Sequence, residues 1–134
     1  KEDYKSKPLT VEQIQESVAA FGKTAKLLRE AGVDGVEIHA VHEGYTLDQF
    51  AIANFNYRTD QYGGSLENRL RFATDIVKEI KKEAGADFPV SLRYSVVSKT
   101  KDFFKGAVPG EEFKEFGRDM AESEKVVKLL EEAG

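Results

Sequence analysis

Two histidines and a tyrosine lie close together in the sequence. His39 and His42 are the two histidines of the chain, and Tyr45 follows three residues after His42. An imidazole pair can ligate a metal, donate hydrogen bonds to a substrate oxygen or move protons, and a tyrosine can donate a proton. Zinc would need a third ligand, which Glu43 or Asp48 could supply. A polar loop with a packed aromatic ring has the same residue types, so the spacing leaves the chemistry open.

Arg93 and a Gly-Gly turn are two further candidates. Arg93 stands near the end of a short, mostly apolar segment. An arginine placed there either pairs with a carboxylate such as Glu37 or points at an anionic ligand, and the sequence leaves both open. Gly63 and Gly64 before Ser65 could hold a phosphate at a helix amino terminus. They lack the Gly-x-Gly-x-x-Gly spacing of dinucleotide sites, which favours a structural turn and helix cap.

Two long helices, each followed by a short strand, are predicted from the apolar pattern. Apolar residues recur every three or four positions in the helices, whereas the strands are short apolar runs beside Gly or Pro. Thr10 and Gln13 match a capping box at the first helix. Ser65 suits the cap of the second helix, and Gly32 suits the end of the first. The predicted elements are helices over 11–31 and 66–84, strands over 33–39 and 88–94, and a third helix ending near residue 133.

The order of these elements contains an internal repeat. Residues 25–32 and 127–134 are closely similar, and each ends in Ala-Gly. Helix, strand and long loop in this order is typical of (βα) units in an α/β fold. Two strands cannot bury both faces of a parallel sheet. We therefore expect the chain to be an internal piece of a larger (βα) repeat.

The candidate residues lie where such folds place their active sites, at the carboxyl ends of the strands. The first predicted strand leads to His39, His42 and Tyr45, and the second leads to Arg93. Long loops without predicted helix or strand follow, over 40–64 and 95–110. We therefore expect these four side chains to share one edge of the sheet.

The composition narrows the classes of function. The 134 residues include 20 Lys or Arg and 24 Asp or Glu, and the net charge of −4 gives no general attraction to nucleic acid or anionic membranes. Cysteine is absent, which excludes disulfides, thiolate catalysis and cysteine-ligated clusters within this chain. No apolar run reaches the ~18 residues of a membrane span, and residues 1–5 lack the apolar core of a signal peptide. We expect a cytoplasmic protein without nucleic-acid or membrane partners.

A long polar and aromatic run occupies residues 56–69, Asn-Tyr-Arg-Thr-Asp-Gln-Tyr-Gly-Gly-Ser-Leu-Glu-Asn-Arg. This run resembles a highly specific motif of the Old Yellow Enzyme-type flavin oxidoreductases, and residues 31–39, 44–50 and 88–93 resemble the same family. Residues 106–113 resemble its branch of 2-enoate reductases and 2,4-dienoyl-CoA reductase-like proteins.

The resemblance implies a partial (β/α)8 TIM barrel of about two βα units, namely the fourth and fifth strands with their flanking helices. Residues 1–134 would be a fragment of a single FMN-binding barrel domain. The implied parent enzyme reduces the C=C bond of an α,β-unsaturated carbonyl or carboxylate compound with NADH through FMN. FAD and a 4Fe-4S cluster would lie outside this segment, and the fragment alone is expected to be inactive.

The resemblance also implies roles for the four candidate residues. His39 and His42 correspond to the pair that holds the substrate oxygen, Tyr45 to the catalytic proton donor, and Arg93 to the arginine beside the flavin. One departure concerns spacing, because many family members place the tyrosine one residue closer to the second histidine. Either the loop bulges or His42 points elsewhere.

A charged scaffold is expected in the loop of the family motif. The resemblance assigns it four ion-pairing residues with a structural role: Arg58, Asp60, Glu67 and Arg69.

Two other functions remain as alternatives. A metal-dependent lyase or hydrolase on another (β/α)8 barrel would use the histidines with a carboxylate, and the motif over 56–69 argues against it. A non-catalytic module would assemble through open strand edges and unburied helix faces, and on the same grounds we expect the fragment to self-associate or the parent to be an oligomer.

Overall fold

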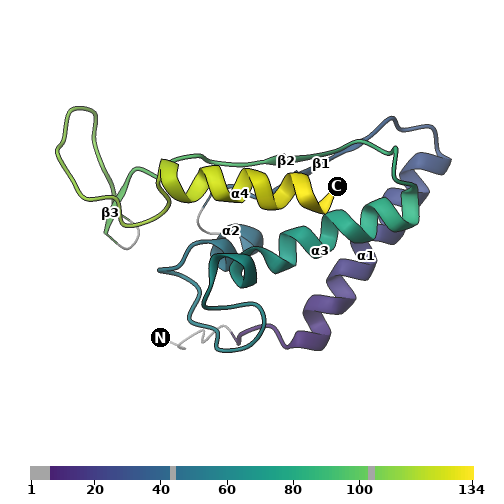
Figure 1. Ribbon diagram of the computed structural model, residues 1–134, viewed down its shortest axis with the longest axis horizontal. Coiled ribbons are helices and arrows are strands. Elements are labelled where there is room, and N and C mark those ends of the chain that lie inside the picture. Colours follow the sequence, from purple (N-terminus) through teal and green to yellow (C-terminus); the bar gives the residue numbers. More distant parts are fainter. Residues whose placement is uncertain (1–6, 43–44, 103–104) are drawn as a thin grey trace, which may run out of the picture.

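The computed structural model describes residues 7–42, 45–102 and 105–134, and its elements form an open α/β arrangement (Figure 1). The elements in chain order are α1 (Val11–Glu30), β1 (Val36–His39), α2 (Thr46–Ala51), α3 (Leu66–Ala84), β2 (Val90–Arg93), β3 (Thr100–Asp102), β4 (Lys105–Gly106) and α4 (Met120–Ala133). Among the described residues, no helix combines the length and apolar character needed to cross a membrane.

β1 and β2 pair in parallel, and their register brings the two strand ends together. Val36 lies opposite Val90 at one end, and His39 lies opposite Arg93 at the other. Side chains alternate between the two faces of a strand, so one face carries Val, Ile and Leu and packs on the helices. The other face is exposed in both strands. The two predicted strands are therefore present, and they form a parallel pair covered by helices on one face.

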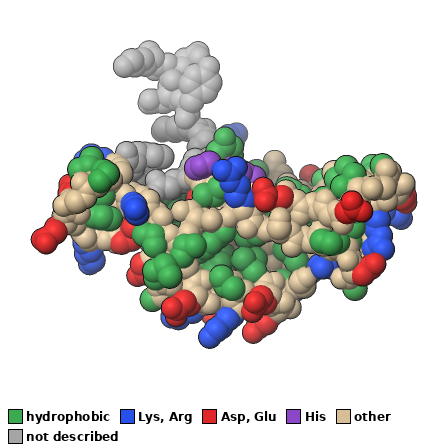
Figure 2. All heavy atoms as spheres, turned by 90° about the horizontal axis from the view of Figure 1, so that it is seen from above, with side chains coloured by type: hydrophobic (Ala, Val, Ile, Leu, Met, Phe, Trp, Pro, Cys, Tyr) green, Lys and Arg blue, Asp and Glu red, His purple; other side chains and the backbone are tan. Residues whose placement is uncertain are grey.

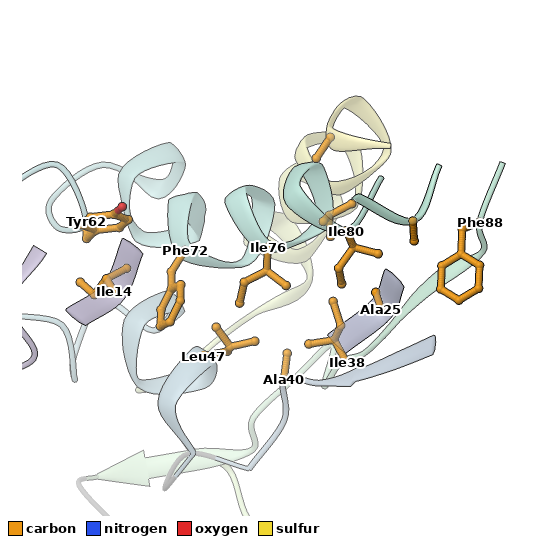
Figure 3. Packing of buried hydrophobic residues seen from close by; sticks show 13 residues of the cluster. Ile14, Ala25, Ile38, Ala40, Leu47, Tyr62, Phe72, Ile76, Ile80 and Phe88 are labelled. Atoms are coloured by element: carbon orange, nitrogen blue, oxygen red, sulfur yellow. The ribbon is translucent and has the colours of Figure 1, made fainter. Parts of the chain in front are cut away.

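The core lies between this sheet and helices α1 and α3. Ile38 and Ala40 at the end of β1 face Ile76 and Ile80 of α3 (Figure 3). Both α3 isoleucines are almost completely buried. At roughly 25 cal/mol per Å² of apolar area removed from water, each such side chain contributes about 2 to 3 kcal/mol. Helices α1 and α3 thus hold the strand ends in place through contacts on the buried face of the sheet.

The helix boundaries follow the predicted caps closely. The Thr10 side chain accepts from the Gln13 backbone at 3.2 Å while the Gln13 side chain accepts from the Thr10 backbone at 2.9 Å, which confirms the capping box. Ser65 accepts from the backbone N–H of Asn68 at 3.3 Å and caps α3. The helix predicted over 66–84 has those bounds in the structure.

Other boundaries differ from the prediction. β1 begins at Val36 rather than residue 33, because the backbone N–H of Val33 closes the end of α1 by donating to Leu28 at 3.0 Å. The two predicted loops contain α2 and the β3–β4 hairpin. These elements have six, three and two residues, which is too short to show a periodic apolar pattern.

Candidate functional site

The carboxyl ends of β1 and β2 form the candidate site. His39 ends β1, Arg93 ends β2, and the two are register partners with exposed side chains. The backbone N–H of Ala40 donates to the Arg93 carbonyl oxygen at 3.0 Å and extends the pairing by one residue. The expectation that these residues share one edge of the sheet is confirmed.

The two imidazoles and the Tyr45 phenol ring form a compact cluster. The ring centroid of His39 lies 5.3 Å from that of His42 and 4.9 Å from that of Tyr45. The centroids of His42 and Tyr45 are 6.0 Å apart. Both histidines are visible at the same edge of the molecule (Figure 2). Tyr45 is 57% exposed, so a molecule arriving from solvent can reach its phenol.

His42 adopts a left-handed backbone conformation with a φ of 72°. Its carbonyl oxygen accepts a hydrogen bond from the backbone N–H of Tyr45 at 2.8 Å, which closes a turn. Glu43 and Gly44 lie outside the described residues. The turn brings the His42 ring beside the other two rings, and so it accommodates the longer spacing without separating His42 from Tyr45.

Arg93 is exposed at the end of β2 on the face of the sheet that the helices do not cover. Glu37, the carboxylate considered as its partner, lies opposite Ser91 in the register. In the part of the chain that the structure describes, neither Arg93 nor Glu37 takes part in an ion pair. The Glu37 pairing is therefore not formed, and the guanidinium is left available to an anionic ligand.

A metal site at the histidines finds little support in the arrangement of the carboxylates. Asp48 is buried and forms an ion pair with Arg118 at 2.8 Å, so its carboxylate is already neutralised. Glu43, the other candidate ligand, lies outside the described residues. Within 7–42, 45–102 and 105–134, no three His, Asp or Glu side chains converge as metal ligands would.

Residues 56–65 of the motif form a loop held by hydrogen bonds, and residues 66–69 begin α3. Arg58 binds Asp60 through Nε at 3.0 Å and Nη2 at 2.5 Å, and its Nη1 donates to the Leu9 carbonyl oxygen at 2.7 Å. The guanidinium lowers the pKa of the Asp60 carboxyl below its usual value, against a smaller opposing effect of burial. The Asn56 amide donates to the Phe50 and Tyr62 carbonyl oxygens, both at 2.7 Å.

Of the four residues predicted to form the ion-paired scaffold, Arg58, Asp60 and Arg69 do form ion pairs, whereas Glu67 forms none within the described residues. The Arg69 guanidinium forms its ion pair with Glu122 of α4 at 2.6 Å rather than with Glu67. It also donates to the Ala51 carbonyl oxygen at 2.8 Å. Glu67 lies on the exposed side of α3, where its own backbone and the Ser65 hydroxyl lower its pKa by hydrogen bonding.

One residue beside the site was missed by the sequence reasoning. Arg118 is 1% exposed, binds Asp48, and lies with its guanidinium carbon 4.1 Å from the centroid of the Tyr94 ring. Burial raises the pKa of the Tyr94 phenol, whose oxygen is 3.1 Å from the Ser123 hydroxyl. Because 70 residues separate Arg118 from Asp48, no local spacing signals the pair.

Comparison with known proteins shows the family of the chain. Residues 1–131 match the NADH:flavin oxidoreductase / NADH oxidase family. The chain belongs to this family. It is 63% identical over 126 residues to the cinnamate reductase of Clostridium sporogenes, covering 94% of this chain and 19% of that protein. It is 37% identical over 126 residues to the NADH oxidase of Thermoanaerobacter brockii, covering 94% and 17%.

Two solved structures are similar to this chain in fold and in sequence. A 2-naphthoyl-CoA reductase in complex with 2-naphthoyl-CoA matches with a TM-score of 0.74 and 33% identity, over 95% of this chain and 17% of that one. The Old Yellow Enzyme from Pichia sp. AKU4542 matches with a TM-score of 0.63 and 39% identity, over 69% and 24%. The chain thus spans less than a quarter of each of these four proteins.

Proposed function

We propose that this chain is part of the FMN-binding (β/α)8 barrel of an ene-reductase that uses NADH. Its substrate would be an α,β-unsaturated carboxylate or thioester. The observation that carries the proposal is the joint position of three groups at one edge of the sheet: an imidazole pair, a phenol and an arginine without an ion-pair partner among the described residues. Similarity to a cinnamate reductase and a 2-naphthoyl-CoA reductase supports the substrate class.

The residues present fit a bound flavin. The Arg93 guanidinium is exposed beside His39 and free to bind the oxygen of the flavin pyrimidine ring, where it would favour the anionic reduced form. When bound, FMN supplies the hydride that the substrate β-carbon receives. The chain has no cysteine, so the thiolate ligands of any 4Fe-4S cluster would lie in other parts of the protein. We place any FAD site there as well.

The chain's own residues would perform the remaining chemistry. His39 and His42 would donate hydrogen bonds to the substrate carbonyl or carboxylate oxygen, which draws electrons from the β-carbon. Tyr45 would deliver its phenolic proton to the α-carbon. One hydride and one proton together complete the two-electron reduction of the C=C bond. The three residues of the cluster are exposed, so a substrate can approach them from solvent.

The experiment uses the full-length protein that contains this chain and follows the flavin spectrum in two half-reactions. NADH should bleach the bound flavin, and cinnamate or a similar enoate should restore its absorbance. Tyr45→Phe should leave the first rate unchanged and lower the second by roughly 100-fold, the contribution of a positioned proton donor. Tyr57→Phe is the matched control, because Tyr57 is exposed in the motif loop. Purified protein without flavin absorbance, or without enoate-dependent reoxidation, would rule the proposal out.

A further inference from the structure

The buried ion pair between Arg118 and Asp48 connects to the loop that carries Tyr45. Asp48 lies in the first turn of α2, three residues after Tyr45, and its Oδ1 accepts from Nη2 of Arg118 at 2.8 Å. The two side chains are 1% and 3% exposed. In such surroundings water screens the pair poorly, so the position of Asp48 is tied to that of Arg118.

The same guanidinium binds the segment that leaves β2. Nη1 of Arg118 donates to the Ser95 carbonyl oxygen at 2.9 Å, and the guanidinium carbon lies over the Tyr94 ring. These two residues directly follow Arg93. Arg118 therefore contacts the segments that follow both site-bearing strands. A lysine could not do so, because it offers a compact point charge rather than a planar fork.

Arg118 has backbone hydrogen bonds that do not involve α2. Its backbone N–H donates to the Ser98 hydroxyl at 3.0 Å, and its carbonyl oxygen accepts from the Ser98 backbone at 3.1 Å. The nearby Glu115 carboxylate accepts from three backbone N–H groups, those of Lys99, Thr100 and Gly117. These hydrogen bonds fix the segment that contains Arg118, so its side chain can hold other segments in place.

Tyr45, in contrast, depends on α2 for its position. It is the N-cap of α2, and its carbonyl oxygen accepts from the backbone N–H of Gln49 at 3.0 Å. A six-residue helix is far below the length that is stable in isolation. The position of the Tyr45 phenol therefore depends on the contacts that fix α2. Asp48 provides a charged one through its ion pair with Arg118.

We propose that Arg118 is a positioning residue of this site. Through Asp48 and Ser95 it sets the place of the Tyr45 phenol relative to His39 and Arg93. The proposal rests on the function proposed above, in which Tyr45 gives up a proton. Arg118 is buried and does not touch the substrate, so it acts only through the segments that it joins.

The test compares Arg118→Lys with Arg58→Lys in the full-length protein. Arg58 is the matched control, because it too forms an ion pair and binds a backbone carbonyl, but in the motif loop. We expect Arg118→Lys to keep the rate of flavin reduction by NADH and to slow flavin reoxidation by cinnamate about 100-fold, the scale expected of an ångström-sized misplacement. Arg58→Lys should change neither rate. A general loss of folding would slow both half-reactions together.

A second readout is independent of activity. The centroids of the Tyr45 and His39 rings are 4.9 Å apart. Compared with a crystal structure of the wild type, a crystal structure of Arg118→Lys should show the Tyr45 ring displaced from His39. If Arg118→Lys fails to fold, the double variant Asp48→Leu with Arg118→Met takes its place, since removing both buried charges avoids leaving one unpaired. An unshifted Tyr45 ring, or reoxidation at the wild-type rate, would overturn the proposal. Wild-type protein that no enoate reoxidises would instead refute the proposed function, and the two crystal structures would still decide the role of Arg118.

Discussion

The left-handed backbone of His42 leads to a prediction about stability that is separate from chemistry. We compare His42→Ala with His42→Gly. Both variants remove the imidazole, so both should lose the same substrate contact. They differ in the backbone, because a residue with a Cβ is strained at the observed φ of 72° and glycine is not.

The magnitude follows from two opposing effects. The left-handed conformation costs a residue with a Cβ roughly 1 to 2 kcal/mol. Glycine loses more backbone entropy on folding than alanine does, which costs about 0.4 to 1 kcal/mol. The difference leaves His42→Gly more stable than His42→Ala by about 1 kcal/mol. Ala20→Gly is the control with the opposite sign, because Ala20 is exposed in the middle of α1 and glycine should cost about 1 kcal/mol there.

The assay is urea unfolding followed by circular dichroism, with midpoints compared at equal slopes. Our reasoning requires the glycine variant at position 42 to have the higher midpoint and the glycine variant at position 20 to have a lower one than wild type. If alanine proves as stable as glycine at position 42, the turn does not hold His42 in the left-handed region. Our explanation of how the turn accommodates the longer spacing between His42 and Tyr45 would then be wrong.

Three further predictions concern the scaffold, the core and the open sheet. The lowered pKa of Asp60 in the folded protein contributes to stability. This contribution is complete above the unfolded pKa of about 3.9, and it is lost as the pH falls through the lower folded pKa. Asp60→Asn should therefore make the stability of the protein depend less on pH in the acid range. Ile76→Ala should lower the free energy of unfolding by about 2 to 5 kcal/mol in urea titrations, because the side chain is completely buried. The 134-residue chain alone should self-associate as its concentration rises, as measured by sedimentation velocity. The reason is that β1 and β2 pair only with each other among the described strands, so each has an open edge. A monomer at every concentration would contradict this prediction.

Most of the fold was predictable from local patterns. The capping box at Thr10, the Ser65 cap and the apolar periodicity of α1 and α3 act within a few residues of one another, so sequence alone is enough to place both long helices. α2 was not predictable, because six residues show no periodicity and its stability comes from burial of Leu47 and Ala51 by distant segments. The β3–β4 hairpin was not predictable either, because its strands of three and two residues are too short to show a periodic pattern.

By itself, the sequence determined the order of helices and strands and the types of residue at the strand ends. It placed His39 and Arg93 on one edge, because parallel strands bring their carboxyl ends together. Only the tertiary structure decided that Arg93 and Glu37 form no ion pair within the described residues, that the His42 turn keeps the three rings in contact, and that Arg118 binds Asp48. Such contacts join segments up to 70 residues apart, and their formation depends on how the helices and sheet pack rather than on any local pattern.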